Sequence, residues 1–176
     1  MAVLGIPKTL FWKDFGKPLT AVPASFMGSH TDCHIGIDFS FTHGGTIPDG
    51  TTGDFKLKDV KVTVKLDALD TWVLDGVPKS ATQAAILKHE QGHFNIAAIA
   101  AKELEAALKA LRNADAGTLI TDADAALASA LSDGQTEEDT YDSDPVDGGT
   151  DHGNNAIQQA KWNGLIAKAK SLADLP

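Results

Sequence analysis

The sequence predicts an α+β fold in which a β-rich part, residues 1–78, precedes a helical part, residues 80–176. Two stretches of the first part alternate apolar and polar residues, which is typical of half-buried strands. An alanine-rich stretch after Ser80 instead repeats its apolar residues at helical spacing. The length of 176 residues suits a single core, so we expect one domain over residues 1–176.

The composition narrows the classes of partner and of site. A formal net charge of −9 argues against nucleic acid or a membrane surface as a partner, because both select a basic face. The single cysteine excludes an internal disulfide and a four-cysteine zinc site. A metal site must therefore use His, Asp or Glu. The start, Met1 to Lys8, has no basic region before its short apolar run, so it does not predict a secretory signal.

Strands are predicted in four places of the first part. Residues 34–42 and 55–66 alternate apolar and polar side chains, and the glycine- and proline-containing segment between them has turn chemistry. Short apolar segments at Thr9–Trp12 and Trp72–Leu74 could supply further strands. We therefore expect a small, mostly antiparallel sheet.

The second part predicts three helices. The first covers residues 81–111 and begins at Ser80, which forms a capping box with Gln83. The other two cover residues 122–131, with Thr121 as N-cap, and residues 155–172. Residues 133–153 are acidic and glycine-rich, so they are expected to form a loop, and loops of this length are often functional.

The strongest motif is His-Glu-x-x-His, formed by His89, Glu90 and His93 within the first predicted helix. Residues four apart lie about 40° apart around a helix and about 6 Å apart along it, so both imidazoles can bind one Zn²⁺. Glu90 lies beside the ligands, where it can accept a proton from a metal-bound water. The motif predicts a metal centre for hydrolysis.

A third ligand must come from another part of the chain. The metzincin pattern requires a histidine six residues after His93, where this sequence has Ile99, so that class is excluded. The downstream candidates are Glu137, Glu138 and His152, the only histidine after His93. The residues themselves leave these three open.

Other polar residues of the 133–153 segment could serve the same centre. Tyr141, the only tyrosine, could donate a hydrogen bond to a developing oxyanion, or could close the edge of the core. Asp142 and Asp151 could orient a ligand histidine, although a solvated loop acid is the simpler interpretation of each. His30 and His34 have the same spacing as the motif but precede a strand, so we expect no second metal site there.

Four segments of the chain resemble a family of bacterial proteins of unknown function that are described as secreted zinc-dependent proteases and grouped with the zincin-like metallopeptidases. Together they extend from about residue 10 to residue 162. The matching segments are Leu10–Gly16, Thr71–Val73, Leu87–Ile96, and a closing motif of Tyr141–Asp142 and Thr150–Gly153 followed by Gln158 and Trp162.

The resemblance implies a zincin-like fold, in which a small sheet packs on the active-site helix and later helices close the site. It also implies His152 as the third ligand in preference to Glu137 or Glu138, and an exported protein. Residues 143–149 look like an insertion within the closing motif, which is a departure from the family pattern.

We therefore expect a zinc metallopeptidase, an endopeptidase rather than an exopeptidase, acting on a protein or peptide substrate. One Zn²⁺ is held by His89, His93 and His152, Glu90 activates the zinc-bound water, and Tyr141 steadies the oxyanion. The alternatives are a catalytically silent metal-binding or interaction module on the same scaffold, and a structural α+β domain with a chance motif. No nucleic-acid or membrane partner is expected, and the sequence is compatible with a monomer.

Overall fold

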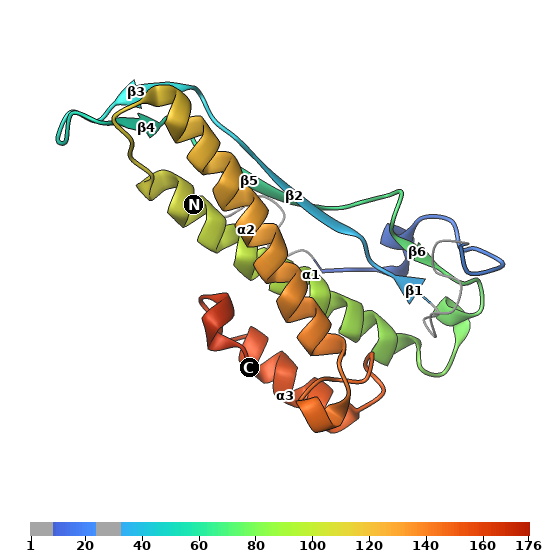
Figure 1. The fold of residues 1–176 in the computed structure, drawn as a ribbon. Coiled ribbons are helices and arrows are strands. Elements are labelled where there is room, and N and C mark those ends of the chain that lie inside the picture. The colour runs from blue at the N-terminus through green and yellow to red at the C-terminus, as the bar shows by residue number, and fades with distance from the viewer. Residues whose placement is uncertain (1–8, 24–32) are drawn as a thin grey trace.

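A computed structural model describes residues 9–23 and 33–176, arranged as a helical hairpin with a β-ribbon along one side (Figure 1). Helices α1 (Gln83–Ala110) and α2 (Ala116–Asp142) form the hairpin and lie side by side along most of their length. The third helix, α3 (Ala156–Ile166), packs on α1. Two parts of the sequence analysis lie outside the described residues: the start, Met1–Lys8, where no secretory signal is predicted, and His30.

The strands pair as three short antiparallel ladders along one ribbon. The pairs are β1 (Cys33–His34) with β6 (Trp72–Val73), β2 (Ile37–Thr42) with β5 (Lys61–Leu66), and β3 (Thr46–Pro48) with β4 (Phe55–Leu57). The β2–β5 and β3–β4 ladders are separated by three residues in each strand, 43–45 and 58–60, so both ladders have the same register. The antiparallel prediction is confirmed, as a nested ribbon rather than one broad sheet.

Two predicted strands are changed by local hydrogen bonding. The 55–66 stretch is interrupted at Asp59, whose φ of 53° lies in the left-handed region that a strand does not use. The strand predicted at Thr9–Trp12 is wrong, because a 3-10 helix, Trp12–Phe15, starts there. The Asp14 carboxylate accepts a hydrogen bond from the Phe11 backbone N–H at 2.9 Å and bends the chain.

The first predicted helix is confirmed with small changes at its start. Helix α1 begins at Gln83, and its N-cap residue, Thr82, makes no side-chain capping bond. The predicted capping box at Ser80 is wrong, because the Ser80 hydroxyl instead donates to the Val77 carbonyl at 2.9 Å and closes the 3-10 turn Val77–Lys79.

The second helix differs most from expectation. It starts at Ala116, with the Asp115 carboxylate as N-cap acceptor for Thr118, and it continues to Asp142. The predicted loop at 133–153 is therefore wrong over its first ten residues. Polar side chains of this stretch bond along the helix surface, as Gln135 does to Asp139 at 2.8 Å, and therefore do not break it.

The third helix is confirmed but ends earlier than predicted. The Asn155 side chain accepts from the backbone N–H groups of Ile157 and Gln158, which fixes the start of α3. The helix ends at Ile166, and a 3-10 turn, Leu172–Asp174, follows.

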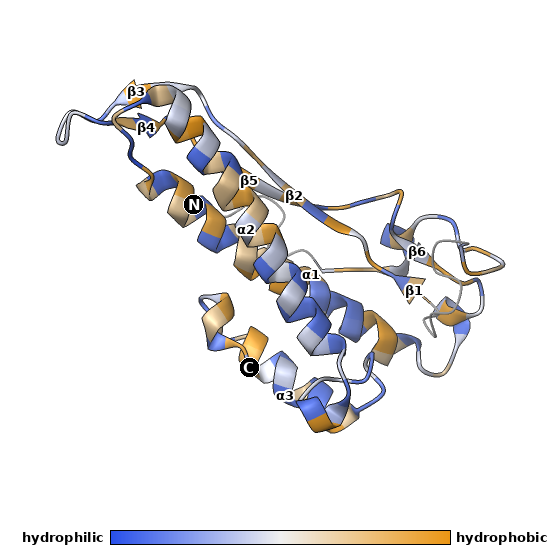
Figure 2. Ribbon diagram, in the orientation of Figure 1, coloured by the Kyte–Doolittle hydropathy of each residue, from blue (hydrophilic) through white to orange (hydrophobic). Residues whose placement is uncertain are grey.

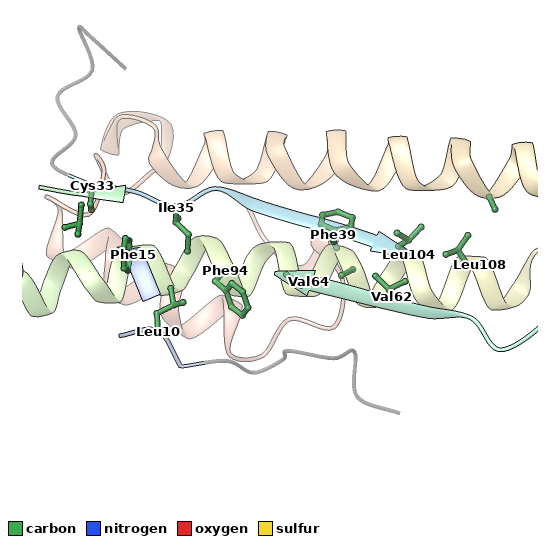
Figure 3. Close-up of a cluster of buried hydrophobic side chains, with 14 of the residues drawn as sticks. Leu10, Phe15, Cys33, Ile35, Phe39, Val62, Val64, Phe94, Leu104 and Leu108 are labelled. Atoms are coloured by element: carbon green, nitrogen blue, oxygen red, sulfur yellow. The ribbon is translucent and has the colours of Figure 1, made fainter. Parts of the chain in front are cut away.

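Two apolar clusters hold these elements together. The larger lies between the ribbon and helices α1 and α2, where Phe39, Val62 and Val64 face Leu104 and Leu108 (Figure 3). The smaller joins α3 to α1 and the end of α2 through Ile96, Ile99, Tyr141, Trp162, Ile166 and Leu175. Figure 2 shows hydrophobic and hydrophilic residues interspersed along α1 and α2, as expected for helices with one buried face. Within the part of the chain that the structure describes, no helix is long and apolar enough to cross a membrane.

Candidate metal centre

The two histidines of the motif converge at the open end of the helical hairpin, where α1 begins and α2 ends. His89 and His93 lie one turn apart on α1, and both are buried. Their Nε2 atoms are 3.2 Å apart, and their rings stand nearly perpendicular at 86°. The i, i+4 spacing therefore brings both ring nitrogens to one point, as predicted from the sequence.

The third group at this point is Asp142, the last residue of α2. Its Oδ1 atom lies 3.0 Å from the Nε2 atoms of both His89 and His93. The three atoms lie close enough together to hold one metal ion. Ligands about 2.0–2.1 Å from a tetrahedral metal stand roughly 3.3 Å apart, so these separations are near those of a coordinated set.

The carboxylate of Asp142 is suited to a cation. Among the described residues no donor reaches its buried Oδ1 atom in hydrogen-bonding geometry, so that oxygen is free to bind a metal. Burial raises the pKa of Asp142, but the two imidazoles beside it outweigh burial and lower the pKa below its ordinary value. The group is therefore charged at neutral pH. The sequence favours a solvated loop acid at Asp142, with the orientation of a ligand histidine as the other interpretation, whereas the structure places its carboxylate with the two histidine nitrogens as a third candidate ligand.

His93 and Glu138 form a second charged contact of the centre. The Glu138 Oε2 atom on α2 lies 3.9 Å from His93 Nδ1. Burial lowers the pKa of His93, but the carboxylates of Asp142, Glu90 and Glu138 outweigh it and raise the pKa to about 9. Burial raises the pKa of Glu138 to about 7, with His93 acting in the opposite direction. Glu138 thus lies beside a histidine of the motif, whereas Glu137 does not line the pocket.

A pocket with a volume of about 170 Å³ opens onto these groups. Glu90 lines it, and its Oε1 atom accepts a hydrogen bond from the Cys33 thiol at 3.1 Å. Cys33 belongs to β1, so the ribbon contacts the glutamate of the motif through this hydrogen bond. The wall of the pocket also includes the apolar side chains of Ile35 and Ile86 and the acidic side chain of Asp139.

His152 lies in the same pocket, at the edge of the centre. Its Nδ1 atom is 3.2 Å from Asp142 Oδ2, the oxygen that faces away from the histidine pair. Its side chain is 53% exposed, and its φ of 48° places it in a tight turn. The next residue, Gly153, packs on His89, where an added Cβ would stand 2.9 Å from the His89 side chain. The prediction that His152 is a ligand stays a prediction.

Tyr141 occupies a different place from the one expected for an oxyanion donor. It is fully buried and stacks on the His89 ring at a centroid distance of 4.8 Å. Its hydroxyl donates to the His89 backbone carbonyl at 3.2 Å and accepts from the Gln159 amide at 2.6 Å. Tyr141 is not among the residues that line the pocket, so its observed contacts are those of a support beneath the centre.

Asp151 is exposed in the turn, as a solvated loop acid would be, and its backbone N–H donates to the Ser143 carbonyl. The groups that face His89 Nδ1 are instead the side-chain oxygens of Gln159, at 3.1 Å, and Thr150, at 3.4 Å. Sequence reasoning missed Gln159. The Asn155 cap that begins α3 was a usable signal, because it puts Gln159 one turn along the helix from a fixed start.

A Gly92→Ala substitution tests the contact between the helices. A Cβ at this position would stand 2.1 Å from the Tyr141 hydroxyl, so Tyr141 must move, and we expect a loss of roughly 1–3 kcal/mol in unfolding free energy. The matched control is Gly164→Ala, also within a helix but with open space around it, which should stabilise by up to about 1 kcal/mol. Denaturant unfolding measures both, and equal effects would contradict the proposed contact.

The raised pKa of His93 predicts pH-dependent metal binding. Below about 9 a proton on His93 competes with the metal, and above that pH the competition ends. The apparent zinc affinity should therefore rise about tenfold per pH unit between pH 6 and 8, as one displaced proton requires. Competition with a chromophoric chelator at several pH values measures the slope, and a flat profile would exclude proton displacement from His93.

Comparison with known proteins gives one match. Residues 29–153 match the family model described as bacterial protein of unknown function (DUF922). No curated protein and no solved structure matches the chain. The matched segment includes β1 to β6, α1, α2 and the turn that carries His152. Because it covers more than half of the sequence and all three groups that converge at the centre, the chain belongs to the DUF922 family of bacterial proteins.

Proposed function

We propose that this protein is a zinc-dependent peptidase with a zincin-like fold. The observation that carries the proposal is the convergence of His89, His93 and Asp142 on one point, with Glu90 on the wall of the same pocket. The packing of the antiparallel ribbon on the helix that bears the motif supports the zincin-like assignment.

Two imidazoles and one carboxylate form a donor set that hydrolytic zinc sites use. The same set also occurs in non-haem iron oxygenases, so the donors do not identify the metal. Glu90 favours hydrolysis, because an oxygenase site has no evident need for a carboxylate immediately beside the first ligand. When bound, Zn²⁺ supplies Lewis acidity, which makes water more acidic and polarises a carbonyl.

The chain's own residues then supply proton transfer and positioning. Glu90 accepts the proton of the attacking water and returns it to the leaving amine as the C–N bond breaks, so one peptide bond and one water give a carboxylate and an amine. The Cys33 thiol donates a hydrogen bond to one oxygen of Glu90 and so restricts the rotation of the carboxylate. The apolar and acidic side chains of the pocket wall provide surfaces for a peptide on either side of the reacting bond.

A Glu90→Gln substitution separates metal binding from catalysis. The amide keeps the shape of Glu90 but cannot accept the proton, so we expect bound zinc near one equivalent and peptide cleavage lower by about 10²-fold or more. Metal analysis together with digestion of a peptide library measures both properties. A variant that cleaves at the wild-type rate would refute the proton-transfer role, and zinc binding by a wild-type protein that cleaves nothing would favour the silent metal-binding module.

A pair of substitutions identifies the third donor. We propose that Asp142 supplies it, because its Oδ1 atom is 3.0 Å from both histidine nitrogens. Asp142→Ala should then lower zinc affinity far more than His152→Ala, which removes a half-exposed ring from the edge of the centre. The reverse order of effects would assign the third position to His152, as the family resemblance implies.

A further inference from the structure

We propose that Gln159 positions His89 for metal binding by fixing which nitrogen of its ring carries the proton. The inference rests on the proposed metal centre and deepens it. Gln159 lies on α3, after the segment 29–153 that matches the family, so it extends the functional unit beyond that segment.

The side chain of Gln159 is held in the interior. The residue is 7% exposed, and the next turn of α3 carries Trp162, which is fully buried and donates from Nε1 to the Gly148 carbonyl at 2.9 Å. Asn155 caps the start of the same helix. These anchors at both sides leave the Gln159 amide little freedom to move relative to His89.

The hydrogen bonds determine which way the Gln159 amide points. Its Nε2 atom lies 2.6 Å from the Tyr141 hydroxyl and 3.1 Å from Asn163 Oδ1. The Tyr141 hydroxyl gives its own proton to the His89 carbonyl, so toward Gln159 it can only accept. The Gln159 atom facing this hydroxyl is therefore the NH₂ group, and the atom facing His89 is the carbonyl oxygen.

Thr150 leads to the same assignment independently. Its hydroxyl gives its proton to the Tyr141 backbone carbonyl at 2.7 Å, so toward His89 Nδ1, 3.4 Å away, it presents only lone pairs. His89 Nδ1 therefore faces two acceptors, Gln159 Oε1 and Thr150 Oγ1. A nitrogen in that position is stable only as N–H.

The consequence lies on the opposite side of the ring. With the proton on Nδ1, a neutral His89 has the lone pair on Nε2, the atom that faces His93 and Asp142. Outer partners of this kind orient a ligand histidine and raise its basicity, and their loss typically lowers metal affinity 10–100-fold.

Three substitutions test the inference through zinc affinity, measured by competition with a chelator. Gln159→Leu removes the acceptor and should lower zinc affinity about 10–100-fold. Gln159→Glu keeps an acceptor toward His89 while it loses both donor bonds, so it should stay close to the wild-type affinity. Gln158→Leu is the matched control, because Gln158 is the neighbouring glutamine on α3, bonds to Pro145 rather than His89, and should leave the affinity unchanged.

The comparison distinguishes positioning from packing. If Gln159 only fills space, a folded Gln159→Leu protein, whose side chain has a similar volume, should keep wild-type affinity, and that result would overturn the proposal, with folding checked by thermal melting without metal. If Gln159 acts only through its NH₂ bonds to Tyr141 and Asn163, Gln159→Glu should lower affinity as much as Gln159→Leu does, and that result would also overturn it. Where Gln159→Leu does not fold, the position of the His89 ring proton decides.

An imidazole-optimised ¹H–¹⁵N spectrum of the zinc-loaded wild-type protein gives a second readout. We expect the His89 proton on Nδ1, and a proton on Nε2 would refute the assignment. Zinc affinity is independent of cleavage, so a protein that binds zinc but cleaves no peptide would fail the proposed function and leave the role of Gln159 intact. A wild-type protein that binds no zinc would overturn both.

Discussion

The close approach of α2 to α1 at Gly92 determines where every other part of the centre lies. Only a residue without a side chain leaves room for the Tyr141 hydroxyl at this point of α1. Because Tyr141 is pinned there, the residue that follows it, Asp142, emerges beside the two histidine rings. Gly92, within the His-Glu-x-x-His segment, thus serves the same site as the two histidines on either side of it.

The segments after α2 contact the centre through His89. The 143–153 connection brings Thr150 and Gly153 against His89, and α3 adds Gln159 and Trp162. The ribbon contacts the motif at Glu90, where the Cys33 thiol donates a hydrogen bond. Around the motif, helix α1 is therefore contacted by α2, the 143–153 connection, α3 and the ribbon, each of which makes a hydrogen bond to His89 or Glu90.

The sequence was most informative where one periodic pattern determines both structure and chemistry. The i, i+4 spacing of His89 and His93 on a helix suffices to bring their Nε2 atoms together, and the structure has them 3.2 Å apart. Sequence reasoning did not identify Asp142 as a candidate ligand because it predicts a loop over residues 133–142. Their helix buries little apolar surface, and its polar residues Gln135, Glu138, Asp139 and Asp142 all line the pocket at helical spacing. The register of α2 against α1 depends on the contact between Tyr141 and Gly92, which no local pattern reveals.

The nested ribbon described above also bears on the order in which the chain can assemble. The β3–β4 ladder closes a loop of only six residues, from Asp49 to Asp54, and only three residues on each side then separate it from the β2–β5 ladder. Each step orders little new chain, so loop-closure entropy favours zipping outward from this turn. The β1–β6 ladder, which carries Cys33 to Glu90, forms at the far end of that sequence. Chain entropy thus favours forming the scaffold before the pocket is completed.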